Sequence, residues 1–236
     1  MRVGVNLLWV VPGEVGGSET WAAGLLSHLA DPRHRPGVEV VAFVTPALLA
    51  AHPWLDGFDD VVVTPPRVGP SRPLRVAAES TWLAVAARRA GVDVVHHPGG
   101  TIPPLRRSPA ALTIHDLQPL HDPASFHPVK RAYLRARLGP SIRRAAVVTG
   151  VSEFTRDDIT ARFGVEALVT PPAVDPDPPA ADVDVRVALR LDRPWFVFPA
   201  ITYAHKRHAT LVRALAEVPE ALLVLTGGAG PEEGAV

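Results

Sequence analysis

Short runs of apolar, often β-branched residues alternate along the chain with longer stretches in which apolar and polar positions recur at helical spacing. The apolar runs predict strands near residues 2–10, 38–44, 60–64, 92–96, 110–114, 145–149 and 167–170. The longer stretches predict helices over residues 18–30, 74–90, 129–144 and 152–163. Gly91 and Gly164 follow two of these helices, where a left-handed cap is favoured. This alternation is typical of helices that connect parallel strands.

Repeated strand–helix units with right-handed crossovers predict an α/β fold, with a Rossmann-like, mostly parallel sheet over residues 1–171. Residues 172–193 are rich in proline, which stiffens the chain and removes backbone donors, so we expect a linker there. Residues 194–236 then contain a strand, a helix and a second strand, the first βαβ unit of another domain. Two strands and one helix cannot cover both faces of a parallel sheet. We therefore expect a truncated second domain.

Composition narrows the range of chemistry. The 236 residues are 47% hydrophobic and carry 24 basic and 24 acidic side chains, so the chain has core material but lacks the basic excess of a general nucleic-acid binder. It contains no cysteine, which excludes disulfides and thiolate chemistry. The apolar start has no cleavage site, and no apolar run approaches the ~18 residues of a membrane span. We expect a cytoplasmic protein.

A glycine-rich turn follows the first predicted strand. It reads GEVGGSE and contains Gly13, Gly16, Gly17 and Glu19 at the start of a helix. Glycines let the backbone turn tightly, and the amides of a helix start favour phosphate or carboxylate groups. A strict GxGxxG pattern is missing, and the second strand ends without an acidic residue, so nicotinamide dinucleotides are disfavoured. A plain tight turn stays open as the alternative.

Polar residues follow two of the predicted strands directly: His96 and His97 end one, and His115 and Asp116 follow another. Ligands of open α/β sheets gather at the carboxyl ends of strands, so both pairs are candidate site residues. For His96 a structural histidine with satisfied hydrogen bonds is equally plausible, whereas for His115 and Asp116 we favour a functional role. No HExxH motif occurs, and no metal site is expected.

Two basic segments remain. Residues 130–144 carry six cations around apolar positions and could rest on anionic lipid headgroups, although a solvated helix face explains them as well. Lys206 stands at the predicted start of the helix in the second domain, where an ammonium suits a diphosphate. A surface helix start is the alternative for Lys206.

In order along the chain, the segments GGSE, TIHDLQPLHDPASFHP, RRAAVVTGVSEFTRDDITARFGV and FPAITYAHKRHATLVRAL resemble family 4 retaining glycosyltransferases, which have two Rossmann-like domains in the GT-B architecture. The resemblance implies a nucleotide-sugar donor as substrate, a glycan or lipid-linked acceptor and neither metal nor cofactor. It also implies a role for each matching position. Those roles are His115 and Asp116 as catalytic residues, Gly16, Gly17, Lys206 and Arg207 as donor-binding residues, and Glu19 and His96 as acceptor-binding residues.

Three departures from the family pattern matter. The family's common lysine–asparagine pair reads Lys206–Arg207 here, the arginine often found some residues before that lysine is not evident, and the chain ends before the usual pair of glutamates. The resemblance thus implies an acceptor domain joined to only part of a donor site. A non-catalytic α/β module that binds a sugar or phosphate is the alternative function.

Overall fold

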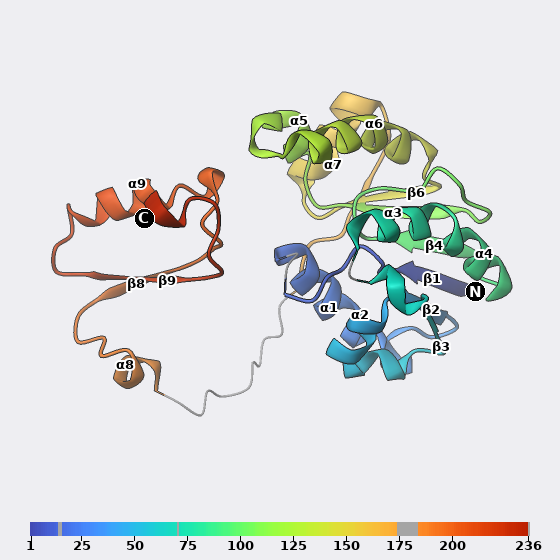
Figure 1. Cartoon of the computed structure of the whole chain (residues 1–236), viewed down its shortest axis with the longest axis horizontal. Helices are drawn as coiled ribbons and strands as arrows, with labels where there is room; N and C mark the ends of the chain where they lie inside the picture. The colour runs from blue at the N-terminus through green and yellow to red at the C-terminus, as the bar shows by residue number, and fades with distance from the viewer. Residues whose placement is uncertain (14–15, 70, 174–183, 236) are drawn as a thin grey trace. The chain divides into compact units, whose positions relative to one another are not determined.

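The structure is a computed structural model that describes residues 1–13, 16–69, 71–173 and 184–235. The chain divides into two compact units, Met1–Val174 and Asp175–Val236 (Figure 1). None of the helices in these described ranges is both long and apolar enough to cross a bilayer.

The first unit is built on a seven-stranded sheet. Its strands are β1 Arg2–Asn6, β2 Glu39–Val44, β3 Asp60–Val63, β4 Val94–His97, β5 Ala110–Ile114, β6 Val147–Gly150 and β7 Leu168–Val169. They lie in the order β3-β2-β1-β4-β5-β6-β7, and every neighbouring pair is parallel. The chain therefore runs outward from β1 in one direction and from β4 in the other, which confirms the Rossmann-like fold.

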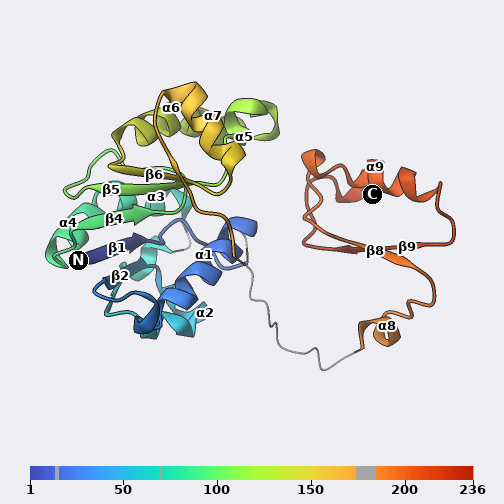
Figure 2. The same ribbon diagram turned by 180° about the vertical axis from the view of Figure 1, so that it is seen from behind.

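Successive residues of a strand point to opposite faces of the sheet, and both faces carry apolar side chains, so helices cover both faces. The helices of the first unit are α1 Gly17–Leu29, α2 Pro46–Ala51, α3 Arg72–Ser80, α4 Trp82–Arg89, α5 Gln118–His121, α6 Pro128–Arg144 and α7 Glu153–Phe163. On one face, Val5 and Ala42 belong to the core cluster that α1 and α2 join. On the other, Phe43 packs with α3 and α4, and Leu112 packs with α6 and α7. Figure 2 shows α1 and α2 beside β1 and β2.

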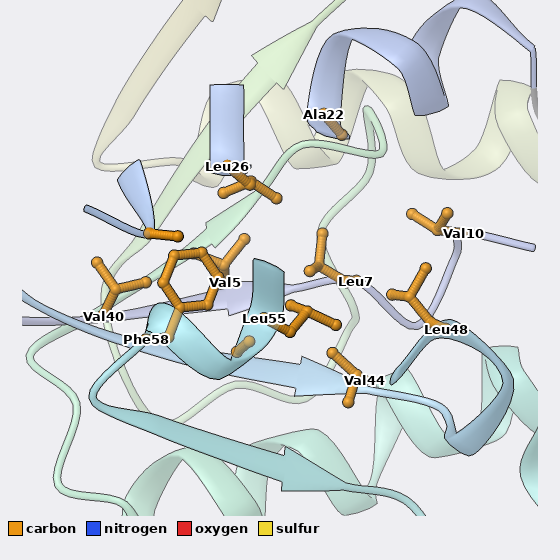
Figure 3. Close-up of a cluster of buried hydrophobic side chains, with 12 residues drawn as sticks. Val5, Leu7, Val10, Ala22, Leu26, Val40, Val44, Leu48, Leu55 and Phe58 are labelled. Carbon is orange, nitrogen blue, oxygen red and sulfur yellow. The ribbon is translucent and has the colours of Figure 1, made fainter. Parts of the chain in front are cut away.

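The core under α1 and α2 is a cluster of buried hydrophobic side chains (Figure 3). Leu7, which directly follows β1, is 1% exposed and packs in this cluster with Leu26 of α1 and Leu48 of α2. Burying a leucine of this kind stabilises the fold by about 1.5–3 kcal/mol. The loop after β1 is therefore held to the core at its start, which positions the glycine turn that follows it.

The structure corrects one predicted helix. The pattern over residues 74–90 forms two helices, α3 and α4, which meet at Thr81. The Thr81 hydroxyl donates to the Ala77 carbonyl at 2.7 Å, a back-bond that bends helices, and the Thr81 backbone leaves the helical region. Gly91 and Gly164 both have φ 65°, as their predicted positions after helices require.

The second unit contains a parallel pair of strands, β8 Trp195–Pro199 and β9 Leu222–Thr226, connected through α9 His208–Leu215. This is the predicted βαβ unit. The proline-rich stretch predicted as a linker contains a short helix, α8 Val185–Ala188, so it is not irregular throughout. Residues 174–183 of that stretch lie outside the described residues.

Candidate functional site

Three segments leave the sheet of the first unit at its carboxyl edge. They are the loop after β1, the turn that begins at Pro98 after β4, and the His115–Asp116 pair after β5. β1 and β4 are neighbours from which the chain runs outward in opposite directions. Ligands of open α/β sheets bind at such a switch point, so this edge is the candidate site.

Two glycines of the turn, Gly13 and Gly16, have the backbone that glycine favours. Gly13 has φ 79° and Gly16 has φ 76°, both in the left-handed region that favours glycine. Gly16 caps α1, and its carbonyl accepts hydrogen bonds from Glu19 and Thr20. The amides at the start of α1 lie at the positive end of the helix dipole, where an anion is stabilised. A phosphate-binding role for Gly16 and Gly17 agrees with this geometry and stays a prediction.

Glu19 closes this turn. Its two carboxylate oxygens accept the Gly13 amide at 3.1 and 3.0 Å, and one of them lies 3.7 Å from His52 Nε2. Glu19, His52 and Trp54 line a pocket of about 560 Å³ beside α1. Sequence reasoning missed His52 and Trp54, because no motif marks them. The acceptor-binding role of Glu19 stays a prediction.

The two histidines of β4 have partners inside the protein. His96 Nε2 lies 2.8 Å from the Thr113 hydroxyl, which is 2.9 Å from the Thr149 hydroxyl on the next strand. Burial, with a smaller contribution from His115, lowers the pKa of His96 to about 4. His97 is 2% exposed and faces the Asn6 amide. These contacts support the structural alternative for both, so an acceptor-binding role for His96 is still a prediction.

His115 is half-buried at the end of β5. Its Nε2 lies 3.0 Å from the Pro98 carbonyl oxygen, and a carbonyl can only accept, so Nε2 carries the proton. The Trp21 ring of α1 meets the imidazole edge-on, with 4.8 Å between ring centroids. Burial lowers the pKa of His115, although the Pro98 contact and the Asp116 charge oppose this shift. His115 is therefore neutral near pH 7, and Nδ1 can accept a hydrogen bond from a hydroxyl.

Asp116 is exposed beside His115, and its carboxylate accepts the Gln118 amide at 2.9 Å. It has cations for neighbours at this edge. Partial burial of the Lys130 ammonium lowers its pKa; Arg72 lowers it further and Asp116 raises it. Lys130 of α6 thus lies near both Asp116 and Arg72 of α3. Sequence reasoning did not find Arg72, because it belongs to no motif.

The predicted diphosphate lysine belongs to the second unit. Lys206 ends a single 3-10 turn, Ala204–Lys206, and its amide donates to the Tyr203 carbonyl at 2.9 Å. The structure corrects its predicted place at the helix start, because α9 begins two residues later, at His208. Arg207 between them has φ 59°, a conformation that costs a non-glycine residue about 1 kcal/mol. Both side chains are exposed.

Among the described residues, no group of three or more histidine, cysteine, aspartate or glutamate side chains is placed to hold a metal ion.

A family model described as Glycosyltransferase Family 4 matches residues 15–178. The chain belongs to glycosyltransferase family 4. The match covers the glycine turn from residue 15 onward, the His115–Asp116 pair and the carboxyl ends of every strand of this sheet except β1. No curated protein matches the chain in sequence.

Solved structures share the fold of this family 4 chain. They include a glycosyltransferase from Rickettsia africae ESF-5, with 14% identity and a TM-score of 0.52 over 94% of this chain. A protein assigned as a UDP-N-acetylglucosamine 2-epimerase from Listeria monocytogenes has 10% identity and a TM-score of 0.58 over the whole chain. S. aureus MnaA, solved with UDP, has 12% identity and a TM-score of 0.54 over 99% of this chain. The family 4 chain spans 59%, 64% and 64% of these three proteins.

The first unit of the family 4 chain brings the glycine turn, His115 and Asp116 to one edge of one sheet. His96 lies on the neighbouring strand, but its ring is used within the sheet. Lys206 and Arg207 belong to the second unit. The predicted site is thus divided between the two units, with the acceptor-side and catalytic candidates in the first.

Proposed function

We propose that the chain is part of a glycosyltransferase that moves a sugar from a nucleotide-sugar donor to an acceptor with retention of anomeric configuration. The family 4 match over residues 15–178 carries this proposal. S. aureus MnaA has the same fold and was solved with UDP, which supports UDP-sugars as the first donors to test. The donor is a substrate, and the proposal includes no resident cofactor.

In this reaction, the bond between the anomeric carbon and the diphosphate breaks, and the acceptor oxygen bonds to that carbon on the same face. The proton of the acceptor hydroxyl passes to the departing diphosphate. Negative charge develops on the leaving diphosphate. Fixed amides and cations stabilise such charge most when they are placed before the reaction begins. The amides of Gly16 and Gly17, with Lys206 and Arg207, are the groups that we assign to this task.

We assign the orientation of the reacting hydroxyl to His115 and Asp116. Neutral His115 presents Nδ1 as an acceptor because Nε2 is held by the Pro98 carbonyl. Its lowered pKa makes it a weak base, so it directs a hydroxyl rather than storing a proton. Exposed Asp116 can accept a second hydroxyl.

The alternative is a binding module that holds a sugar or phosphate without transferring it. The deciding experiment incubates the protein with UDP-, GDP- and ADP-sugars and a panel of oligosaccharide acceptors, and detects new glycosides by mass spectrometry. Transfer supports the enzyme. Release of the nucleoside diphosphate without a new glycoside is donor hydrolysis and still indicates an enzyme. Binding of the donor without turnover favours the module.

Lys206→Ala tests the donor side. Loss of a charge-assisted contact to a phosphate costs about 1.5–3 kcal/mol, so kcat/KM should fall about ten- to a hundredfold. Lys206→Arg should recover only part, because the two cations differ in shape and hydration. Arg213→Ala removes another exposed cation from the same unit and serves as the control. Unchanged kinetics in Lys206→Ala would remove the lysine from the site.

We also propose that α6 contacts an anionic membrane surface. The helix carries Lys130 and five arginines without any acidic residue, and within the described ranges none of these six forms an ion pair. Val129, beside them, is 73% exposed. Each cation near an anionic surface contributes about 1 kcal/mol. The fraction of protein that floats with phosphatidylglycerol vesicles should fall in an Arg131→Gln/Arg135→Gln variant but not in the control Arg88→Gln on α4. Equal flotation of the wild type and both variants would support the solvated-face alternative.

A further inference from the structure

A pocket of about 560 Å³ lies beside α1, facing the corner where α2 meets the 3-10 turn Pro53–Gly57. One wall is the α1 surface at Thr20, Ala23 and Gly24, and the other wall is formed by His52 and Trp54. Gly13, Gly16 and Glu19 contribute further to its lining. This volume is in the range of small-molecule sites. Roles were assigned above to Glu19 and Gly16 of its lining, but not to His52, Trp54 or the α1 surface.

The polar groups of the pocket suit a hydroxyl. The Trp54 indole N–H donates to His52 Nδ1 at 3.2 Å, so a neutral His52 carries its proton on Nε2. Nε2 lies 3.7 Å from Glu19 Oε1, which is too long for a direct hydrogen bond. A hydroxyl between them can accept from Nε2 and donate to the carboxylate. The side chains of His52 and Glu19 are only 19% and 14% exposed, so the pair is held in place by its surroundings.

The charge of the lining argues against an anionic ligand. Among the described residues, the lining contains no lysine or arginine, and the carboxylate of Glu19 repels a phosphate or carboxylate group placed against it. The apolar part of the lining suits the C–H face of a ring. Gly24 has open space where a side chain would be, and Trp54 is fixed by an edge-on contact with Phe58, with 6.0 Å between ring centroids. Aromatic walls with a few placed polar groups are typical of ligand pockets.

We propose that this pocket binds a neutral sugar unit of the acceptor. Glu19 and His52 would hold one sugar hydroxyl, and Trp54 would contact the apolar side of the ring. Gly13 and Gly16 also line the pocket, so the sugar would lie next to the turn that we assign to the donor diphosphate. The word acceptor rests on the proposed transferase function, whereas binding of a neutral sugar does not. The substrate class is then an uncharged glycan rather than a sugar phosphate.

The test measures binding to the 236-residue chain in the absence of any donor. Saturation-transfer NMR is recorded with the methyl glycosides of glucose, mannose, galactose and N-acetylglucosamine, with glucose 6-phosphate and with choline. We expect at least one neutral glycoside to bind, with a dissociation constant on the order of millimolar. Glucose 6-phosphate and choline should bind less tightly than that glycoside.

Two variants place the binding in the pocket. Glu19→Gln removes the carboxylate charge at nearly constant size, and Trp54→Phe keeps an aromatic ring but loses the N–H that orients His52. Each should weaken sugar binding at least tenfold. Asp56→Asn removes an exposed charge from the same corner without touching the pocket and should bind as the wild type does. Circular dichroism melts establish that each variant is folded before binding is compared.

Three outcomes overturn the proposal. They are no binding of any neutral glycoside, tighter binding of the phosphate or of choline, and binding that neither variant weakens. Sugar binding in a protein without transferase activity would leave the pocket assignment intact and reject only the word acceptor. Transferase activity without sugar binding in the pocket would reject the pocket and keep the enzyme.

Discussion

His97 allows a sharp test of how burial controls charge at the carboxyl edge. The side chain is 2% exposed, and its Nδ1 lies 3.3 Å from the amide nitrogen of Asn6, which also donates to Glu79 at 2.9 Å. Burial, helped by the charges of His96 and Arg106, lowers the pKa of His97 from 6.5 to about 3. The folded protein therefore keeps this ring neutral at a pH where the unfolded chain protonates it.

The size of the expected loss in unfolding free energy follows from the linkage between protonation and folding. Because the folded pKa is the lower one, the stabilising contribution is complete above pH 6.5 and is lost as the pH falls from 6.5 toward 3. At a pH of about 5, some 1.5 pKa units below the unfolded value, the loss is about 2 kcal/mol at ~1.4 kcal/mol per unit. His97→Gln has no proton to bind, so it should avoid this part of the acid destabilisation.

The assay is urea unfolding near pH 7.5 and near pH 5, followed by tryptophan fluorescence. Four of the five tryptophans, Trp9, Trp21, Trp54 and Trp82, lie in the first unit, so the signal reports on it. Between the two pH values, His97→Gln should lose about 2 kcal/mol less free energy of unfolding than the wild type. His127→Gln, at an exposed histidine, should lose as much as the wild type.

A His97→Gln variant that loses as much stability in acid as the wild type would refute the reasoning. It would mean that the folded protein protonates His97, or that the β4 end opens to water before the unit unfolds.

Three further predictions concern other positions. Burial raises the pKa of Glu79 to about 7, so the contribution of this group to stability is complete below pH 4.5 and is lost as the pH rises through 7. Glu79→Gln should remove this loss of unfolding free energy, measured by urea unfolding. A variant whose unfolding free energy falls with rising pH as steeply as that of the wild type would contradict the prediction. His115→Ala should lower the free energy of unfolding by about 1–3 kcal/mol through its lost carbonyl and ring contacts and also reduce sugar transfer; normal transfer by the folded fraction would make the residue purely structural. Gly164→Ala, at φ 65°, should destabilise by about 1 kcal/mol in thermal unfolding, whereas Gly24→Ala inside α1 should stabilise by a similar amount, and equal effects would be inconsistent with the left-handed cap.

Local patterns were sufficient for most of the fold. Each apolar run contains a strand, because residues that must be buried on both faces of a sheet leave a continuous apolar signature. The first strand is shorter than predicted, since it ends at Asn6 rather than at residue 10. The left-handed caps at Gly91 and Gly164 were also predictable, since backbone conformation at a helix end depends on a few neighbouring residues. The break at Thr81 was not predicted, because a threonine hydroxyl can point to solvent or bond back to the preceding turn, and the helical pattern is the same in both cases.

The candidate site was likewise predictable from the sequence only in part. By itself, the sequence determined which residues follow the strands, and hence that the glycine turn, His115 and Asp116 meet at one sheet edge, because parallel strands end at the same side. Only the tertiary structure decided the hydrogen-bond partners, tautomers and neighbours of the candidate site residues. The ring of His96 is hydrogen-bonded to Thr113, and the Pro98 carbonyl fixes the proton of His115 on Nε2. Glu19 lines a pocket together with His52 and Trp54, which lie outside α1. Burial, tautomer and pocket shape depend on neighbours that are distant in sequence, and no local pattern encodes those distances.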